Sequence, residues 1–396
     1  MSDRARFAPW TSRTSAWIGI GTGPGAMMVG AGIASQVGPA IALPAAIAGS
    51  LVVYALGVAH GLEALRTRVP MGASVRRVFG EGAPSAVFTL VIVLAMIGWC
   101  GFYLGIGGAA LSDLLATNQV GGALLLGGVC AALALLGQNT WNRLVYLTAG
   151  SAVALTVFTV TAISALPPSQ LSPPSIGEGI VTGIGAVVSY AIVFTMRAPD
   201  FTVDLEASRD VWLAGLTMLV PLAVVMSIGV WLYGRTGLFD IAGVLRRTER
   251  PEAGQLFLAL SAIAPAVTVI YSSAISIQSL RRIRHEVVVV AISGAAFVLG
   301  AIRFDLRLLA FLQALGTVVP SALVVMLVHP RLDPAPSPVL SLSAWGAGSA
   351  CALAIRSIEP FWGFVVGGLV TAASLWMMSK VQMRKQAGAP TSREGA

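Results

Sequence analysis

The sequence predicts an all-α integral membrane protein with about twelve transmembrane helices, and its composition leads to this prediction. Apolar residues make up 56% of the 396 residues and charged residues only 11%, and the mean hydropathy is +0.83. Soluble domains contain fewer apolar residues and about 25% charged residues. Because one span needs roughly 20 apolar residues, the chain has room for about a dozen spans and for no soluble domain.

Hydropathy along the chain locates the predicted spans. Twelve apolar segments lie at 15–36, 38–60, 84–111, 120–137, 144–166, 179–199, 211–233, 255–280, 286–302, 306–328, 340–357 and 360–379. They divide the chain into a cytoplasmic N-terminal tail (1–14), helices 1–5 (15–166), an outer connector (167–178), helices 6–10 (179–328), helices 11–12 (329–380) and a cytoplasmic tail (381–396).

Basic residues predict the orientation of these spans. With both termini in the cytoplasm, 18 of the 25 Lys and Arg residues lie on the cytoplasmic side, as the positive-inside rule requires. We therefore expect a multi-pass protein of the cell (inner) membrane, with no signal peptide in Met1–Thr14. Four of the seven outer basic residues fall in 235–254, which is either a short amphipathic helix at the outer interface or a miscounted span.

Few groups in the sequence are able to perform catalysis or bind a metal. The three cysteines lie inside apolar segments without ligand spacing, so we expect them to be small core residues. The three histidines fall at predicted inner ends of helices, where a solvated role is expected. No HExxH, CxxC or P-loop pattern occurs. The sequence thus predicts neither an enzyme nor a bound cofactor, and the scattered basic residues do not form a nucleic-acid interface.

The first span contains a stretch, "WIGIGTGPGAMMVGAG" (17–32), that is rich in glycine. A dinucleotide-binding loop is excluded because 38–50 lacks the acidic residue that such a loop needs. The glycines permit close packing through the GxxxG pairs Gly19–Gly23 and Gly21–Gly25. They also permit a broken helix, since Pro24 lacks an N–H and glycine leaves helical geometry at low cost.

A broken helix inside a membrane is typical of transporters with inverted repeats, in which the break recurs in the second half. If helices 1–5 repeat as helices 6–10, the counterpart of helix 1 is helix 6, "GIVTGIGAVVSYAIVFTMRAPDFTVDL" (179–205). This segment also has spaced glycines and a proline, Pro199. The match favours a transporter.

Four segments resemble the nucleobase–cation symporter-1 family, and the cytosine and purine permeases in particular. They are "GASVRRVFGEGAP" (72–84), "GWCGFYLGIGG" (98–108), "RAPDFTVDL" (197–205) and "YSSAISIQSL" (271–280). The resemblance extends over about 15–330. It implies a leucine-transporter-type five-plus-five inverted repeat with two C-terminal helices, and import of a nucleobase or related nitrogen heterocycle such as cytosine, a purine, a hydantoin or another pyrimidine.

The resemblance also implies a substrate-binding site. A tryptophan of helix 3 stacks on the substrate ring in this family, and Trp99 occupies the matching position. A flat heterocycle on an indole is a chemically sound pairing. The other expected substrate contacts are Tyr103, Ser189, Tyr190, Thr268 and the helix 1 backbone at Gly23, Pro24, Gly25 and Ala26.

Helix 8 departs from the family in two places. Thr268 stands where cytosine permease carries an amide. A single hydroxyl, which donates and accepts at one atom, therefore replaces a bidentate group with separate donor and acceptor atoms. Ala264 and Pro265 stand where adjacent hydroxyls bind sodium. Sodium coupling is therefore doubtful, although Ser261 remains a candidate ligand. A co-transported proton would need a titratable group near the path, and Asp200 is a candidate that could equally pair with Arg197 or tether the inner loop.

Two other functions remain open. An amino-acid or other organic-solute permease on the same fold would place a substrate carboxylate at the amides of helix 1. A membrane-embedded enzyme or sensor would bind a ligand without accumulating it. The expected partners are a small heterocyclic substrate and the lipid bilayer, and the oligomeric state is not predicted.

Overall fold

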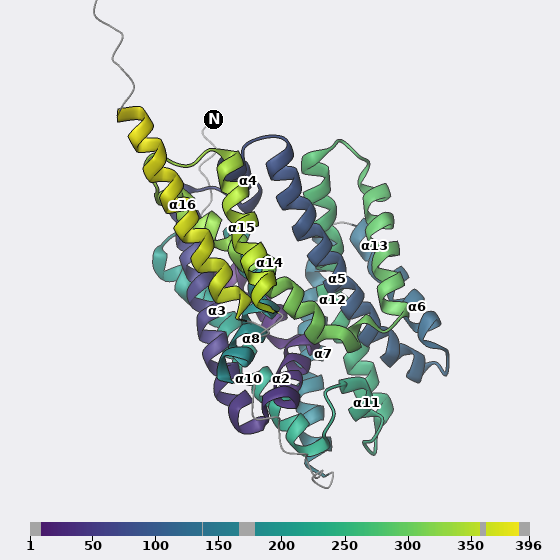
Figure 1. The fold of residues 1–396 in the computed structure, drawn as a ribbon. Coiled ribbons are helices and arrows are strands. Elements are labelled where there is room, and N and C mark those ends of the chain that lie inside the picture. The colour runs from purple at the N-terminus through teal and green to yellow at the C-terminus, as the bar shows by residue number, and fades with distance from the viewer. Residues whose placement is uncertain (1–8, 137, 166–178, 357–361, 388–396) are drawn as a thin grey trace, which may run out of the picture.

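The computed structural model describes residues 9–136, 138–165, 179–356 and 362–387. This part of the chain forms a bundle of helices without β-strands (Figure 1). The predicted outer connector over 167–178 lies outside the described residues, as do residues 1–8 and 388–396 of the predicted tails.

The helices of the first half are η1 (Trp10–Arg13), α1 (Thr14–Thr22), α2 (Pro24–Val37), α3 (Pro39–Thr67), α4 (Met71–Phe79), α5 (Ala83–Leu114), α6 (Gln119–Leu135) and α7 (Gln138–Ser164). Those of the second half are α8 (Ile180–Met196), α9 (Ala198–Thr202), α10 (Ser208–Thr236), α11 (Ile241–Leu245), α12 (Pro251–Leu280), α13 (His285–Ala301), η2 (Phe304–Arg307), α14 (Leu308–Val328) and η3 (His329–Arg331). Two more helices follow, α15 (Pro338–Arg356) and α16 (Gly363–Ala387).

Each predicted span coincides with one long helix or with a broken helix. Seven helices of the described part are long and apolar enough to cross a membrane, and four shorter apolar helices accompany them. The remaining predicted span, 15–36, is the pair α1–α2, which is interrupted at Gly23. Large apolar side chains also cover the outside of the bundle, for example Leu94 and Leu369, which are 65% and 66% exposed. Such a surface suits lipid, and the protein is a multi-pass membrane protein.

The helices pack as two copies of one arrangement. In a five-plus-five repeat, α1–α2 corresponds to α8–α9 and α3 corresponds to α10. The contact of α2 with α10 is then equivalent to the contact of α3 with α8, and both are among the most extensive in the molecule. Between them α5 packs along α12, its own counterpart. This arrangement places both broken helices beside α5.

The bundle has two distinct ends. The short helix α4 lies at one end together with the C-terminal end of α16, and α11 lies at the other (Figure 1). We call them the α4 end and the α11 end. The α11 helix falls in the segment 235–254, for which an interfacial helix was one prediction. A short helix does form, but its apolar side chains are buried, because it packs on α12, α2 and α5.

Candidate functional site

The helix that contains the glycine-rich stretch is broken at Gly23. The residue has φ −59° and ψ 151°, so the chain leaves helical geometry there and resumes it at Pro24, the first residue of α2. The amide of Ala26 donates to the Gly23 carbonyl at 3.0 Å. Proline suits the first turn of a helix because its missing N–H would be unpaired there in any case. The sequence prediction of a broken helix at this position is confirmed.

Gly21 and Gly30 of the stretch serve packing, so the two interpretations of the stretch apply to different residues. A Cβ on Gly21 would lie 2.8 Å from the Met218 carbonyl, and one on Gly30 would lie 2.0 Å from the Met226 carbonyl. Both carbonyls belong to α10, which α1 and α2 therefore approach closely. A Cβ on Gly19, by contrast, would have no neighbour within 4 Å among the described residues.

The second broken helix is interrupted at Arg197, between α8 and α9. This residue has φ −88° and ψ 1°, a milder departure from helical geometry than that of Gly23. Pro199 follows within the first turn of α9. The glycines that suggested the match with helix 1 do not form this break. Gly183 instead leaves room for Ala45 and Ile33, which a Cβ would approach to 2.5 and 3.0 Å.

Trp99 lies at the centre of a cluster of aromatic rings. Its ring centroid lies 5.1 Å from that of Tyr190 and 5.3 Å from that of Phe311, both edge to face. Trp99 itself is 0% exposed. We call the cluster the aromatic box; its members are Trp99, Phe102 and Tyr103 from α5, Tyr190 and Phe194 from α8, and Phe311 from α14.

Glycines next to the aromatic box make room for its rings. A Cβ on Gly25 would lie 3.1 Å from Tyr190 and 3.2 Å from Phe102. A Cβ on Gly98 would lie 2.6 Å from Phe311. The hydroxyl of Tyr190 is hydrogen-bonded to Tyr103 and to the backbone of Ala26. The break in helix 1, α5 and α8 thus meet at the aromatic box.

Two polar atoms in this region are buried without a partner. Among the described residues, Nε1 of Trp99 and Oγ of Ser189 have no hydrogen-bond partner. An unpaired buried donor costs about 1–3 kcal/mol, so such atoms are uncommon and call for an explanation. A polar ligand that hydrogen-bonds to them provides one.

A cavity of about 650 Å³ opens at the α4 end and leads toward the aromatic box. Residues three, four or seven apart share one face of a helix, so the lining residues show which face of each helix borders the cavity. On α5 the lining residues Ile92 and Met96 continue into Trp99 and Tyr103. Met196 of α8 lies seven residues after Ser189. The inner face of the cavity therefore runs toward these predicted substrate contacts.

Thr268 of α12 lies seven residues before Ile275, which also lines the cavity. The structure thus brings together the faces that carry Trp99, Tyr103, Ser189 and Thr268. The hydroxyl of Thr268 donates to the Ala264 carbonyl at 2.8 Å, so its two lone pairs remain to accept bonds from a ligand.

The two candidates for ion coupling already have hydrogen-bond or ion-pair partners in the protein. The hydroxyl of Ser261 donates to the Leu258 carbonyl one turn earlier on α12. Asp200 makes both structural contacts that were considered for it: it pairs with Arg197 at 3.1 Å and accepts a bond from the Met71 amide at 3.0 Å. Asp200 also lines the cavity. Among the described residues, no three His, Cys, Asp or Glu side chains are grouped as a metal site.

Three members of the aromatic box were not predicted from the sequence: Phe102, Phe194 and Phe311. Phenylalanine is common in apolar spans, and nothing in its local sequence distinguishes a ring at a site from a ring in the core. The pairing of Trp99 with Tyr103 at i and i+4 was predictable from helical spacing, and their ring centroids lie 6.2 Å apart.

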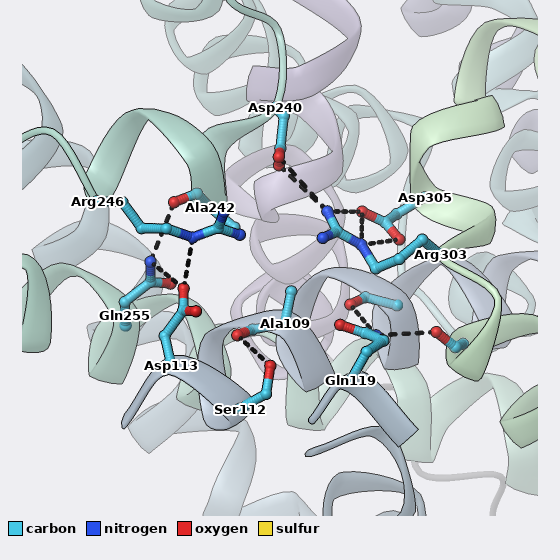
Figure 2. Close-up of polar contacts among 12 residues, drawn as sticks. Ala109, Ser112, Asp113, Gln119, Asp240, Ala242, Arg246, Gln255, Arg303 and Asp305 are labelled. Carbon is cyan, nitrogen blue, oxygen red and sulfur yellow. Dashed lines mark hydrogen bonds and ion pairs between the residues drawn. The ribbon is translucent and has the colours of Figure 1, made fainter. Parts of the chain in front are cut away.

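Polar networks close the α11 end of the bundle (Figure 2). Arg303 donates to both carboxylate oxygens of Asp305, which is fully buried, and lies 3.5 Å from Asp240. Arg246 pairs with Asp113 at 2.7 Å. These ion pairs join the loop segments that contain Asp240 and Arg246 to the ends of α5 and α13.

Gln119 adds a neutral link at the same end. Its amide donates to the carbonyls of Gly105 and Gly300 at 3.1 and 2.9 Å. These bonds tie the start of α6 to α5 and to the end of α13 (Figure 2).

Comparison with known proteins identifies the fold. No family model matches the chain, and no curated protein matches its sequence. Solved structures do match. The inward-facing conformation of Mhp1 has a TM-score of 0.77 at 16% identity, over 97% of this chain and 94% of Mhp1. Mhp1 in a closed conformation with bromovinylhydantoin bound, described as a nucleobase-cation-symport-1 family transporter, has a TM-score of 0.74 at 15% identity, over 96% and 94%.

A Na⁺-coupled sialic acid symporter in its outward-open state matches less closely, with a TM-score of 0.64 at 12% identity, over 96% of this chain and 93% of the symporter. The chain therefore has the fold of leucine-transporter-type membrane transporters, as the sequence predicted.

Proposed function

We propose that this protein is a secondary transporter similar to the nucleobase–cation symporter-1 family, which imports a small planar nitrogen heterocycle by alternating access. One observation carries the proposal: an aromatic box, whose Trp99 Nε1 has no hydrogen-bond partner among the described residues, lies beside the break in helix 1 and on α5 and α8, two helices that also line the cavity of the α4 end. The fold supports it, since the three matching structures described above are transporters.

The chemistry of the aromatic box favours a flat, uncharged ligand. Its members are aromatic, and the polar atoms around it are hydroxyls, an indole N–H and backbone groups. Aromatic faces stack on heterocycles, while the indole N–H donates and the hydroxyls of Tyr103, Tyr190 and Ser189 donate or accept. Mhp1 has bromovinylhydantoin, a planar nitrogen heterocycle, bound in one of its structures.

The conformation of this chain corresponds to release of substrate. The cavity opens at the α4 end while ion pairs hold the α11 end closed. We place the α4 end in the cytoplasm of the cell (inner) membrane, because the basic loops and both termini then lie inside. A substrate leaving the aromatic box would pass Met96 and Met196 into the cavity.

The ring spacing shows what must move for a substrate to enter. The centroids of Trp99 and Phe194 lie only 6.2 Å apart, and a third ring stacked between two others needs about 7 Å between the outer pair. A substrate that stacks between these two rings would therefore require Phe194 to turn away from Trp99. This rotation belongs to α8, the outer part of the second broken helix.

Uptake by proteoliposomes tests the proposal. Purified protein in liposomes is given labelled cytosine, hypoxanthine, hydantoin and a thiazole or pyrimidine vitamin precursor, under sodium or pH gradients. We expect accumulation of at least one of these. Accumulation of none of them, together with uptake of amino acids, would establish the alternative of an amino-acid or organic-solute permease on the same fold. Binding without accumulation would establish a sensor or enzyme.

Substitution of Trp99 tests the binding site. Stacking of a base on an aromatic side chain contributes about 1–3 kcal/mol, so Trp99→Ala should weaken substrate affinity roughly five- to 150-fold. Trp99→Phe should retain part of it. Trp212→Ala is the matched control, because Trp212 of α10 is 47% exposed on the outside of the bundle. Undiminished uptake by Trp99→Ala would overturn the stacking role.

A further inference from the structure

A histidine is buried beside the second broken helix. His60 of α3 is 3% exposed, whereas the sequence predicted a solvated position at the end of a helix. Its Nδ1 lies 3.3 Å from the carbonyl oxygen of Thr195, in the last turn of α8. His60 thus contacts the backbone immediately before the break at Arg197.

Pro199 explains why this carbonyl is available. In a continuous helix the Thr195 carbonyl would accept a bond from the amide of the residue four positions later. That residue is Pro199, which has no N–H. In place of that donor, the amide of Arg197 and the ring of His60 from α3 both contact the Thr195 carbonyl. The break in the helix and the histidine therefore form one structural unit.

This contact determines which ring nitrogen is basic. A carbonyl oxygen only accepts hydrogen bonds, so Nδ1 of His60 must carry its hydrogen. In the neutral ring Nε2 then keeps its lone pair. Among the described residues, no hydrogen bond to Nε2 is formed. A proton that arrives at His60 binds there.

A small cavity gives water access to this region. It has a volume of about 20 Å³, and its lining includes His60, Glu63, Thr67, Arg77 and Pro199. A cavity of roughly 10–15 Å³ with polar walls is sufficient for one water molecule. At the rim, Glu63 pairs with Arg331 at 3.2 Å, and Arg331 is half exposed. The small cavity therefore has room for one water molecule beside His60, and the ion pair of Glu63 lies at its edge.

Charged groups surround His60 on several elements. Asp200 of α9 and Arg331 of η3 both act on it electrostatically. Glu63, one turn later on α3, and Arg77 of α4 line the same small cavity. Asp200 also lines the large cavity and pairs with Arg197. Carboxylates favour a charged imidazole and arginines oppose it, so movement of α9 or η3 changes the proton affinity of the ring.

We propose that His60 is the site of a co-transported proton, which binds at Nε2 and couples the protonation of one ring to the conformation of the broken helix α8–α9. The proposal rests on the function proposed above and identifies its coupling ion. Protonation turns Nε2 from an acceptor into a donor, in a ring that shares its small cavity with Glu63 and is acted on by the charge of Asp200, while Nδ1 keeps its contact with Thr195. The absence of hydroxyls at Ala264 and Pro265, where the family's sodium ligands are expected, agrees with a proton in place of sodium.

The test compares His60→Asn with the wild type in proteoliposomes at zero membrane potential. The Nδ2 of asparagine replaces Nδ1 as a donor to the Thr195 carbonyl, but asparagine does not titrate. The probe is whichever of cytosine, hypoxanthine and hydantoin the wild type takes up. For one proton per substrate, a gradient of one pH unit supports at most about tenfold accumulation.

We expect the wild type to accumulate the probe up to this limit. His60→Asn should exchange labelled for unlabelled probe at a rate within about twofold of the wild type and show no accumulation driven by the pH gradient. His329→Gln is the matched control, since His329 is also buried at the α4 end and contacts the Pro336 carbonyl through Nε2 at 3.0 Å. This control should accumulate the probe like the wild type.

A second measurement does not depend on folding of the variant. A pH-sensitive dye trapped in wild-type vesicles should report acidification when the probe enters without an imposed gradient. Exchange without acidification, or tenfold accumulation by His60→Asn, would overturn the coupling role of His60. If the wild type moves no heterocycle at all, the proposed function fails, and the coupling proposal fails with it.

Discussion

The two ends of the bundle differ in how their polar groups are used. At the α11 end, Arg303, whose side chain is 21% exposed, forms a charge pair with the fully buried Asp305. At the α4 end the pair of Arg197 and Asp200 is partly exposed and lines an open cavity. The same kinds of residue thus close one end and border the other.

This difference shows what holds the present conformation. A buried ion pair is difficult to separate because either charge alone would remain desolvated. A partly exposed pair is screened by water and separates at little cost. The α11 end is therefore the more firmly closed of the two, and opening of this end requires Asp305 and Arg303 to become hydrated or to find other partners.

Removal of Arg303, which pairs with the buried Asp305, should have the largest effect on the closure of the α11 end. Arg303→Met leaves Asp305 buried without its counter-charge, which costs about 3–5 kcal/mol. We expect a lower midpoint of thermal unfolding in detergent and a more accessible α11 end. The double variant Arg303→Met with Asp305→Asn is the control and should recover most of the loss. A single variant as stable as the wild type would show that the pair does not close this end.

Chemical labelling should distinguish the two ends of a single helix. Thr89 lines the cavity at the α4 end of α5, whereas Ser112 is 9% exposed at the α11 end. In a background with Cys100, Cys130 and Cys351 changed to alanine, Thr89→Cys should react with a polar thiol reagent at least about tenfold faster than Ser112→Cys, since minor open states are populated at 10% or less. Equal rates would contradict the closure of the α11 end.

The neutral link at the α11 end should have a smaller effect. Gln119→Ala removes two hydrogen bonds from the carbonyls of Gly105 and Gly300, each contributing about 0.5–1.5 kcal/mol. The unfolding midpoint should fall, and Ser112→Cys should react somewhat faster. Val120→Ala serves as the control, because Val120 is 49% exposed. If the two variants behave alike, Gln119 does not contribute to the closure.

The exposed ion pair of the same end should matter least. Arg246 and Asp113 have side chains that are 45% and 33% exposed, and such pairs contribute about 0–1 kcal/mol. Arg246→Ala should therefore lower the unfolding midpoint slightly at low salt, and the difference should shrink in high salt because screening already weakens the pair. A loss as large as that of Arg303→Met would contradict the distinction between buried and exposed pairs.

The break at Gly23 was predictable because its cause is local. A proline next to glycines within an apolar span disturbs the helix wherever that span packs. The break at Arg197 was only partly predictable. The repeat argument pointed to helix 6 and to Pro199, but Gly183 suggested flexibility where the structure shows close packing against Ala45 and Ile33.

The histidines show the limit of arguments from position along a span. They were expected to be solvated because each lies near the end of a predicted helix. His60 and His329 are buried instead, because α4, α9 and η3 fold over the end of the bundle. The sequence contains these short helices but does not show what they cover. The same holds for α11, whose apolar residues pack on the bundle and not at the outer interface.

The sequence by itself determined that the chain is a helical membrane protein, where its spans lie, that helix 1 is broken and that Trp99 and Tyr103 share one face, since hydropathy, backbone chemistry and helical spacing act over a few residues. Only the tertiary structure decided that Phe194 and Phe311 meet Trp99, that a cavity opens at one end while ion pairs cross the other, and that His60 contacts the Thr195 carbonyl, to which Pro199 cannot donate. These contacts join residues up to about 200 positions apart, and they depend on how whole helices pack.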